Sequence, residues 1–208
     1  MMNKTFDAFL NGKLKITQPS NGYRAATDPV FLAASVPASS GQSVLDVGSG
    51  VGVASLCLGA RVSNLRLYGI ELQREYFLMS EHNAIENNIN LKVVNANLND
   101  LPADFRQKSF DHVMTNPPFF VTKTLSKPVA QGKSIANIEN ISLNDWIFFS
   151  LKRLKSGGSF SIIHLTERLP VINVRSFSES ATVVSELGGA FVEHMQAQGV
   201  LAALKHFP

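Results

Sequence analysis

Short apolar runs alternate along most of the chain with longer segments whose apolar residues have helical spacing. Five runs have the length and composition of buried strands, at residues 43–48, 65–71, 91–95, 110–115 and 159–164. Helical spacing falls between several of these runs, at residues 51–60, 73–87 and 143–155. Strands and helices that alternate in this way build a parallel sheet with helices on both faces. The pattern therefore predicts an α/β fold with a mostly parallel central sheet.

The last of these helices carries signals for both of its ends. Ser142 is a good N-cap with Asp145 three residues later, which is a capping arrangement. Basic residues follow near the expected end, and Gly157-Gly158 comes directly after them. We therefore expect the helix to begin after Ser142 and to end just before the two glycines.

The two ends of the chain depart from this alternation. A helix is expected from Asp28-Pro29 to Val36, because proline is favoured in a first helical turn. Residues 1–42 are thus predicted as an N-terminal segment and residues 43–208 as the main domain, within one globular unit. Residues 168–208 show no clean pair of alternating strands, so the sequence leaves open whether they form a C-terminal strand hairpin.

Composition narrows the possible functions only slightly. The 208 residues include 45% hydrophobic and 17% charged ones, which is typical of a soluble globular protein. No apolar stretch is long enough to cross a bilayer, and the N-terminus lacks the pattern of a signal peptide. The lone cysteine, Cys57, lies in an apolar helical stretch and is expected to be packed, as in a reducing compartment. We expect a cytoplasmic protein; its net charge of +3 permits a polyanionic partner without requiring one.

The first predicted strand runs into a glycine-rich turn, Asp46-Val47-Gly48-Ser49-Gly50-Val51-Gly52, and then into a helix. Glycines allow a sharp turn and close approach of a ligand to the backbone, and the free N–H groups of the helix can bind a carboxylate or phosphate. The next strand ends in Glu71, which can accept both hydroxyls of a ribose. A dinucleotide motif would require Gly or Ala where Val53 stands. The acid at position 46 and the three glycines instead match the pattern of S-adenosylmethionine (SAM)-dependent methyltransferases.

A second motif, Asn116-Pro117-Pro118-Phe119, follows the fourth predicted strand. Two prolines stiffen a strand end and donate no hydrogen bonds, so the plain alternative is a turn. If the Asn116 oxygen and the Pro117 carbonyl accept the two N–H bonds of an amino group, the nitrogen lone pair becomes free to attack a methyl group. Phe119 offers a flat face on which a flipped base can stack. The motif predicts methylation of an exocyclic or amide nitrogen.

With both motifs, the chain resembles the small-domain class I methyltransferases, and most closely the bacterial tRNA1(Val) adenine-N6-methyltransferases. The segment Gln18–Ala34, with Gly22-Tyr23-Arg24 and Asp28, is similar to a stretch that closes over the SAM site in that family. The resemblance implies a Rossmann-like class I methyltransferase fold, in which Tyr23, Arg24, Asp28, Leu72, Asn97 and Leu98 border the cofactor or substrate. Asn97 stands where the family usually has an acid that binds the SAM adenine, and the family's C-terminal hairpin is not legible here.

The sequence leaves several functions open. The leading hypothesis is methylation of adenine N6 in a tRNA, with Lys123 and Lys127 beside the motif as phosphate contacts. A guanine-N2 rRNA methyltransferase or a protein glutamine-N5 methyltransferase would use the same Asn-Pro-Pro turn. A SAM-binding scaffold without catalysis is the alternative from another class. The five histidines have no metal-ligand spacing, so no metal is expected, and no oligomeric state is predicted.

Overall fold

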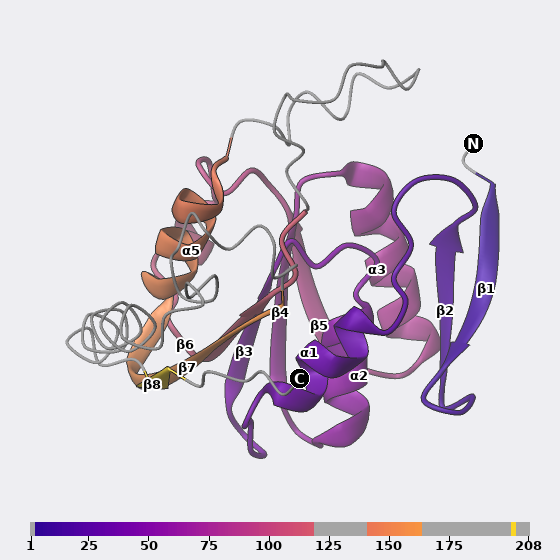
Figure 1. The fold of residues 1–208 in the computed structure, drawn as a ribbon, viewed down its shortest axis with the longest axis horizontal. Coiled ribbons are helices and arrows are strands. Elements are labelled where there is room, and N and C mark those ends of the chain that lie inside the picture. The colour runs from indigo at the N-terminus through magenta and orange to yellow at the C-terminus, as the bar shows by residue number, and fades with distance from the viewer. Residues whose placement is uncertain (1–2, 119–140, 164–200, 203–208) are drawn as a thin grey trace, which may run out of the picture.

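The computed structural model describes residues 3–118, 141–163 and 201–202, and all statements of structure below refer to these residues. Its main feature is a sheet in the order β5-β4-β3-β6-β7-β8, in which every described pair of strands is parallel (Figure 1). The strands are β3 (Ser43–Val47), β4 (Arg66–Glu71), β5 (Leu91–Asn95), β6 (Phe110–Thr115), β7 (Leu154–Ile162) and β8 (Leu201–Ala202). The predicted parallel α/β fold is confirmed.

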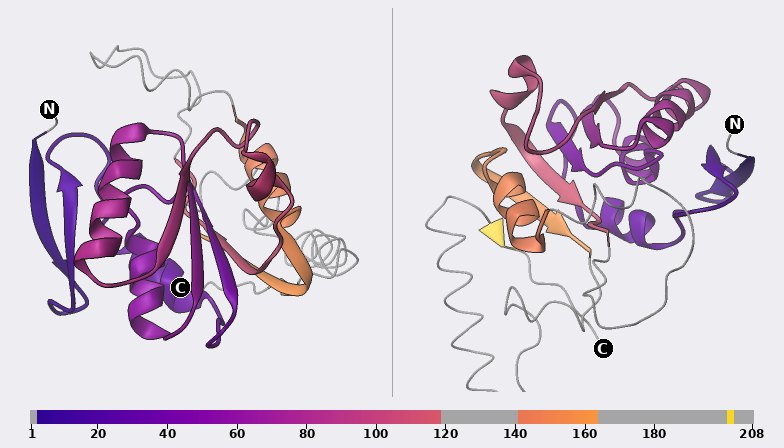
Figure 2. Two further views of the ribbon diagram at one scale, coloured as in Figure 1. Left: turned by 180° about the vertical axis from the view of Figure 1, so that it is seen from behind. Right: turned by 90° about the horizontal axis from the view of Figure 1, so that it is seen from above.

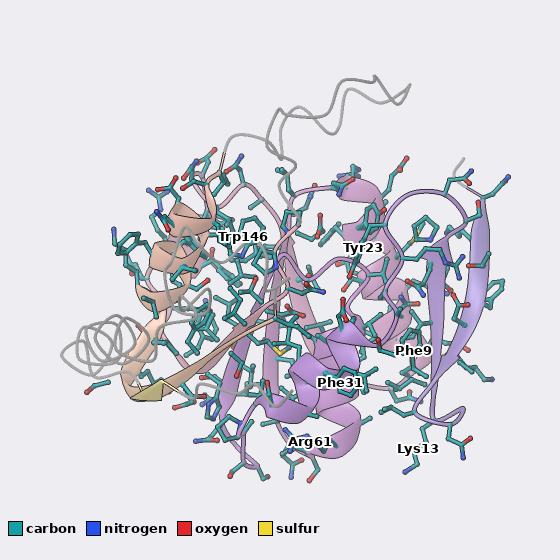
Figure 3. The ribbon with its side chains drawn as sticks, in the orientation of Figure 1. Phe9, Lys13, Tyr23, Phe31, Arg61 and Trp146 are labelled. Atoms are coloured by element: carbon teal, nitrogen blue, oxygen red, sulfur yellow. The ribbon has the colours of Figure 1, made fainter. Side chains whose placement is uncertain are left out.

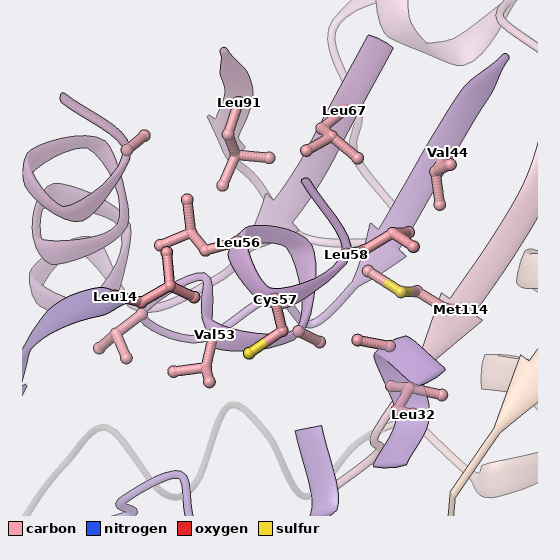
Figure 4. Packing of buried hydrophobic residues seen from close by; sticks show 14 of the residues in the cluster. Leu14, Leu32, Val44, Val53, Leu56, Cys57, Leu58, Leu67, Leu91 and Met114 are labelled. Atoms are coloured by element: carbon pink, nitrogen blue, oxygen red, sulfur yellow. The ribbon is translucent and has the colours of Figure 1, made fainter. Parts of the chain in front are cut away.

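Helices cover both faces of this sheet, as the view from above shows (Figure 2). They are α1 (Asp28–Ser35), α2 (Val53–Arg61), α3 (Arg74–Glu86), the short α4 (Ala103–Arg106) and α5 (Leu143–Leu151). On one face α2 is the centre of a buried cluster with α1, α3 and the sheet (Figure 4). On the other face, Phe105 of α4 and Trp146 of α5 pack against the opposite side chains of β3 and β4. Adjacent residues of β3, Val44 and Leu45, belong to different clusters, as expected for a strand buried on both sides.

Cys57 lies in the cluster around α2. Its side chain is 3% exposed, and burial raises the pKa of its thiol to about 11. The expectation of a packed thiol is therefore confirmed.

An antiparallel hairpin of β1 (Lys4–Phe9) and β2 (Leu14–Pro19) precedes α1 and was not predicted from the sequence. Two side-chain amides of α3 hold it against the domain. The Asn83 amide accepts from Thr17 N at 2.8 Å and donates to Thr17 O at 3.0 Å, and Asn87 makes the same pair of bonds with Lys15. The hairpin is thus fixed by contacts between residues far apart in the sequence.

The predicted end of α5 was wrong. Ser142 caps the helix as expected, since its Oγ accepts from Asp145 N at 3.1 Å, but α5 ends at Leu151 and β7 already begins at Leu154. Gly157 and Gly158 lie inside this strand. A Cβ on Gly158 would come within 2.8 Å of the Asp111 carbonyl oxygen, so the glycine permits close approach of β6 and β7 where their register shifts.

Within the described part of the chain, no helix combines the length and apolar character needed to cross a membrane.

Candidate functional site

A cavity of about 280 Å³ lies at the carboxyl edge of the sheet. The strand order reverses at β3, which has β4 on one side and β6 on the other, and ligands of α/β proteins bind at such a reversal. Four neighbouring strands deliver their following residues to the cavity wall. In spatial order these are Asn97 and Leu98 after β5, Glu71 and Leu72 at the end of β4, Gly48 and Gly50 after β3, and Asn116, Pro117 and Pro118 after β6.

The glycine turn has left-handed backbone conformations that favour glycine, with φ of +73° at Gly48 and +56° at Gly50. A Cβ on Gly48 would lie 2.7 Å from the Trp146 ring, whereas nothing lies within 4 Å of a Cβ on Gly50. Gly48 therefore makes room for an aromatic wall of the cavity. Gly50 leaves open space beside the cavity, where a ligand can approach its backbone.

Two other residues of the turn do not line the cavity. Gly52 is the N-cap of α2, where a side chain would meet Ser80 of α3. Ser49 is buried against Gly69 of β4, and its hydroxyl has no hydrogen-bond partner among the described residues.

Glu71 is 6% exposed and fastens the end of β4 to the glycine turn. Its carboxylate accepts hydrogen bonds from Gly50 N at 2.9 Å and from Gln73 N at 2.7 Å. Burial raises the pKa of the carboxyl group, and these backbone N–H groups oppose that shift. Because a carboxylate has about four acceptor positions, it keeps capacity to accept from a ligand hydroxyl beside these bonds.

Asp46 lies beneath the turn and is not part of the cavity wall. It is 2% exposed, accepts a hydrogen bond from Ser55 Oγ at 2.8 Å, and burial raises its pKa to about 7. The structure therefore brings Asp46 to α2, behind the predicted cofactor site. Its expected role in placing the methionine end of SAM, directly or through water, stays a prediction.

Asn116 lies at the other end of the cavity. Its Nδ2 donates to the Tyr23 hydroxyl at 3.2 Å, which joins the end of β6 to the segment between β2 and α1. Below it, Trp146 Nε1 donates to Thr115 Oγ1 at 2.7 Å, and that hydroxyl donates to Val47 O at 2.7 Å. Tyr23 and Trp146 thus flank the cavity from the N-terminal segment and from α5 (Figure 3).

Two residues of the N-terminal motif lie outside the cavity wall. Arg24 forms an ion pair with Asp7 of β1 at 2.7 Å and donates to Thr5 Oγ1 at 2.7 Å, so its charge is already compensated within the hairpin. Asp28 is the first residue of α1, one position after the N-cap Thr27. Phe119, Lys123 and Lys127 lie outside the described residues.

Sequence reasoning missed part of the wall, namely Ile70, Gln73, Tyr76, Ala96, Ile141 and Trp146. Gln73 and Ala96 each lie within two residues of a predicted site residue and could have been found by proximity. Tyr76 and Trp146 come from helices, and nothing in their local pattern distinguishes them from ordinary core aromatics.

Comparison with known proteins supports the class that this fold and site define. The solved precorrin-6y C5,15-methyltransferase of Geobacter metallireducens GS-15 shares the fold with a TM-score of 0.52 at 15% identity, covering 87% of this chain and 77% of that one. TrmN from Thermus thermophilus has a TM-score of 0.50 at 19% identity, covering 68% of this chain and 38% of that one. The architecture is therefore that of a Rossmann-like class I methyltransferase.

The family model of the methyltransferase small domain matches residues 26–168, and the chain belongs to this family. The tRNA1(Val) (adenine(37)-N6)-methyltransferase of Trichodesmium erythraeum (strain IMS101) is 28% identical over 171 residues, which cover 80% of this chain and 68% of that protein. The enzyme of the same name from Pedobacter heparinus is 31% identical over 118 residues, covering 55% of this chain and 49% of that protein. The family match confirms the predicted resemblance. It also confirms the prediction that the chain is a methyltransferase that uses SAM as its cofactor.

The end of the chain has a different similarity. The model of the glycosyl hydrolase family 3 N-terminal domain matches residues 163–208. A stretch of 39 residues is 69% identical to beta-hexosaminidase A of Pseudoalteromonas piscicida but covers only 6% of that protein. The methyltransferase match thus ends at residue 168, close to where the other match begins.

Proposed function

We propose that this chain transfers a methyl group from SAM to an exocyclic amino nitrogen, namely N6 of an adenine in a tRNA. The observation that carries the proposal is the position of Asn116 at the cavity wall, with its amide nitrogen engaged by Tyr23. The amide oxygen is then the acceptor available to a target amino group. Pro117 and Pro118 stiffen the same wall and compete with no backbone N–H donors of their own.

The order of the residues along the sheet edge suits SAM bound in one orientation, with its adenine near β5 and its amino-acid end near the turn after β3. Glu71 has free acceptor positions for ribose hydroxyls, Asn97 can accept from the adenine amine, and the open side of Gly50 suits the amino-acid end. Tyr23, Leu72 and Leu98 would enclose the cofactor, with Asp46, Ser49, Gly52, Arg24 and Asp28 supporting the wall from behind or from its margin. When bound, SAM supplies a methyl group activated by its sulfonium.

The chemistry asked of the protein is positioning. The Asn116 oxygen and the Pro117 carbonyl hold the two N–H bonds, so that the amino lone pair faces the methyl carbon. That lone pair forms the new N–C bond while the electron pair of the C–S bond returns to sulfur, and the nitrogen then loses one proton to solvent. No covalent enzyme intermediate is required.

A second cavity of about 370 Å³ supports RNA as the substrate class. It shares Leu98 and Ile141 with the first cavity. Its wall has three basic residues and one acidic residue, and is therefore net basic: Arg106, Lys152, Arg153 and Asp145. Phe148, which is 56% exposed, lies on the same wall. Basic groups beside an exposed aromatic ring suit a phosphate backbone and a stacked base. The names of the relatives above, which are tRNA methyltransferases, support the same substrate class. A cytoplasmic location follows from a tRNA substrate.

Methylation of guanine N2 in rRNA or of a protein glutamine would use the same Asn-Pro-Pro wall. Phe119, which we expect to stack on a base, favours the nucleic acid. That the methyltransferase domain extends beyond residue 168 to residue 208 stays a prediction. We propose no hydrolase activity for this chain, because the match to the hydrolase is short.

Replacement of Asn116 by Ala tests the proposal. We expect kcat for methyl transfer to tRNA to fall about 100- to 1000-fold, as when one preorganised polar contact is removed, while SAM affinity stays unchanged. Asn116→Asp keeps an acceptor beside a nitrogen that becomes cationic and should retain more activity than Ala. Asn90→Ala, at an exposed position away from the cavity, is the control. Full activity of Asn116→Ala would show that the Asn-Pro-Pro motif is only a turn.

A further inference from the structure

The side-chain amide of Asn116 has two ends of similar shape and opposite hydrogen-bonding character. Only the oxygen can accept an N–H bond from a target amino group; a flipped amide would present its own N–H bonds to that group. The orientation must therefore be set by a partner of the amide. Among the described residues that partner is Tyr23, whose hydroxyl accepts from Asn116 Nδ2 at 3.2 Å.

Tyr23 is itself held in place from both sides. Tyr76 of α3 donates from its hydroxyl to the Tyr23 carbonyl at 3.2 Å. The preceding Gly22 gives Tyr76 room, since a Cβ there would come within 2.9 Å of the Tyr76 hydroxyl oxygen. The following Arg24 is anchored to Asp7 of the hairpin. The backbone at Tyr23 is thus fixed at a point where its hydroxyl reaches the cavity.

The ring of Tyr23 contributes little to the core, because it is 52% exposed. Partial desolvation, with Asp28 and Asp46 nearby, raises the pKa of Tyr23, so the group stays neutral and keeps its proton over the ordinary working range of pH. A neutral hydroxyl can accept from Asn116 without placing a charge beside the cofactor.

We propose that Tyr23 is a positioning residue, which holds the Asn116 amide with its oxygen toward the amino group to be methylated. The inference rests on the proposed function and adds a role that the N-terminal segment plays in the chemical step. In this role Tyr23 does more than cover the cofactor, because it affects methyl transfer through the orientation of Asn116.

A double-mutant cycle with Tyr23→Phe and Asn116→Asp tests this role in the full chain, with SAM and tRNA as substrates. Tyr23→Phe keeps the ring and removes the hydroxyl, and should lower kcat about 3- to 10-fold, the usual effect of one lost hydrogen bond. The KM for tRNA and the Kd for SAM should stay the same. In the Asn116→Asp background both carboxylate oxygens are acceptors, so orientation no longer matters. There Tyr23→Phe should change kcat by about twofold or less, a clear departure from additivity.

Tyr68→Phe is the matched control, because Tyr68 packs against Phe105 and Phe110 away from the cavity and should leave kcat unchanged. If Tyr23→Phe were as active as an active wild type, the role of Tyr23 would be overturned and the proposed function would stand. Equal losses in the two Asn116 backgrounds, or a loss confined to KM, would also overturn it, because Tyr23 would then act on the substrate directly. A wild type that methylates no RNA would instead overturn the proposed function.

Discussion

The indole ring of Trp146 occupies the space that a side chain at Gly48 would need: a Cβ there would come within 2.7 Å of ring atom Cζ2. The contact joins the glycine turn after β3 to α5. Glycine is therefore needed at position 48 for two reasons: the backbone there is left-handed, with a φ of +73°, and the Trp146 ring leaves no room for a side chain.

We expect Gly48→Ala to lower the free energy of unfolding by about 2–4 kcal/mol, from left-handed strain together with overpacking. Gly41→Ala is the control, since Gly41 has a φ of +85° but nothing within 4 Å of the added Cβ. It should lose only the strain, about 1–2 kcal/mol. Urea denaturation measures both, and equal losses would show that the Trp146 contact can relax without cost.

A second prediction concerns the cofactor. Glu71→Gln keeps the shape of the side chain and removes its charge, so binding of S-adenosylhomocysteine should weaken about 10- to 100-fold, as for a lost hydrogen bond to a charged group. Glu75→Gln, at an exposed position in the first turn of α3, is the matched control. Calorimetry on both variants decides the question. Unchanged binding by Glu71→Gln would confine Glu71 to its structural bonds with Gly50 and Gln73.

The pH dependence of stability tests the burial of Asp46. Its pKa is raised to about 7 in the folded chain from an ordinary value of 3.8, so the folded state holds a proton that the unfolded state has lost in this window. Stability due to this group therefore falls as pH rises from about 4 to 7, by up to about 1.4 kcal/mol per pH unit, and is constant above that range. The difference in free energy of unfolding between wild type and Asp46→Asn should follow this course. A difference independent of pH would refute the assignment.

RNA binding provides a fourth prediction. Charge reversal at Lys152 on the second cavity, and at Lys123 and Lys127 beyond the Asn-Pro-Pro motif, should weaken binding of tRNA and leave SAM binding unchanged. Each lost phosphate contact should reduce the slope of log affinity against log salt by about one. Lys92→Glu on β5, away from both cavities, is the control. Binding that ignores salt and these lysines would indicate a protein or small-molecule substrate.

The sequence alone determined the parallel sheet, its glycine turn and the Asn-Pro-Pro strand end. These features are local: buried parallel strands are continuous apolar runs, and tight turns near a ligand need glycine at fixed spacing. Because the carboxyl ends of parallel strands meet at one edge, the sequence also implied that Glu71, Gly50 and Asn116 would gather there. The cavity contains all three in its wall.

Only the tertiary structure decided which partners these residues have. The β1–β2 hairpin depends on the amides of Asn83 and Asn87 in α3, and the charge of Arg24 is used by Asp7, so Arg24 does not reach the cavity. The orientation of Asn116 depends on Tyr23, 93 residues away. Periodicity reports which face of an element is buried, whereas such hydrogen bonds depend on which elements meet, and that is set by the packing of the whole domain.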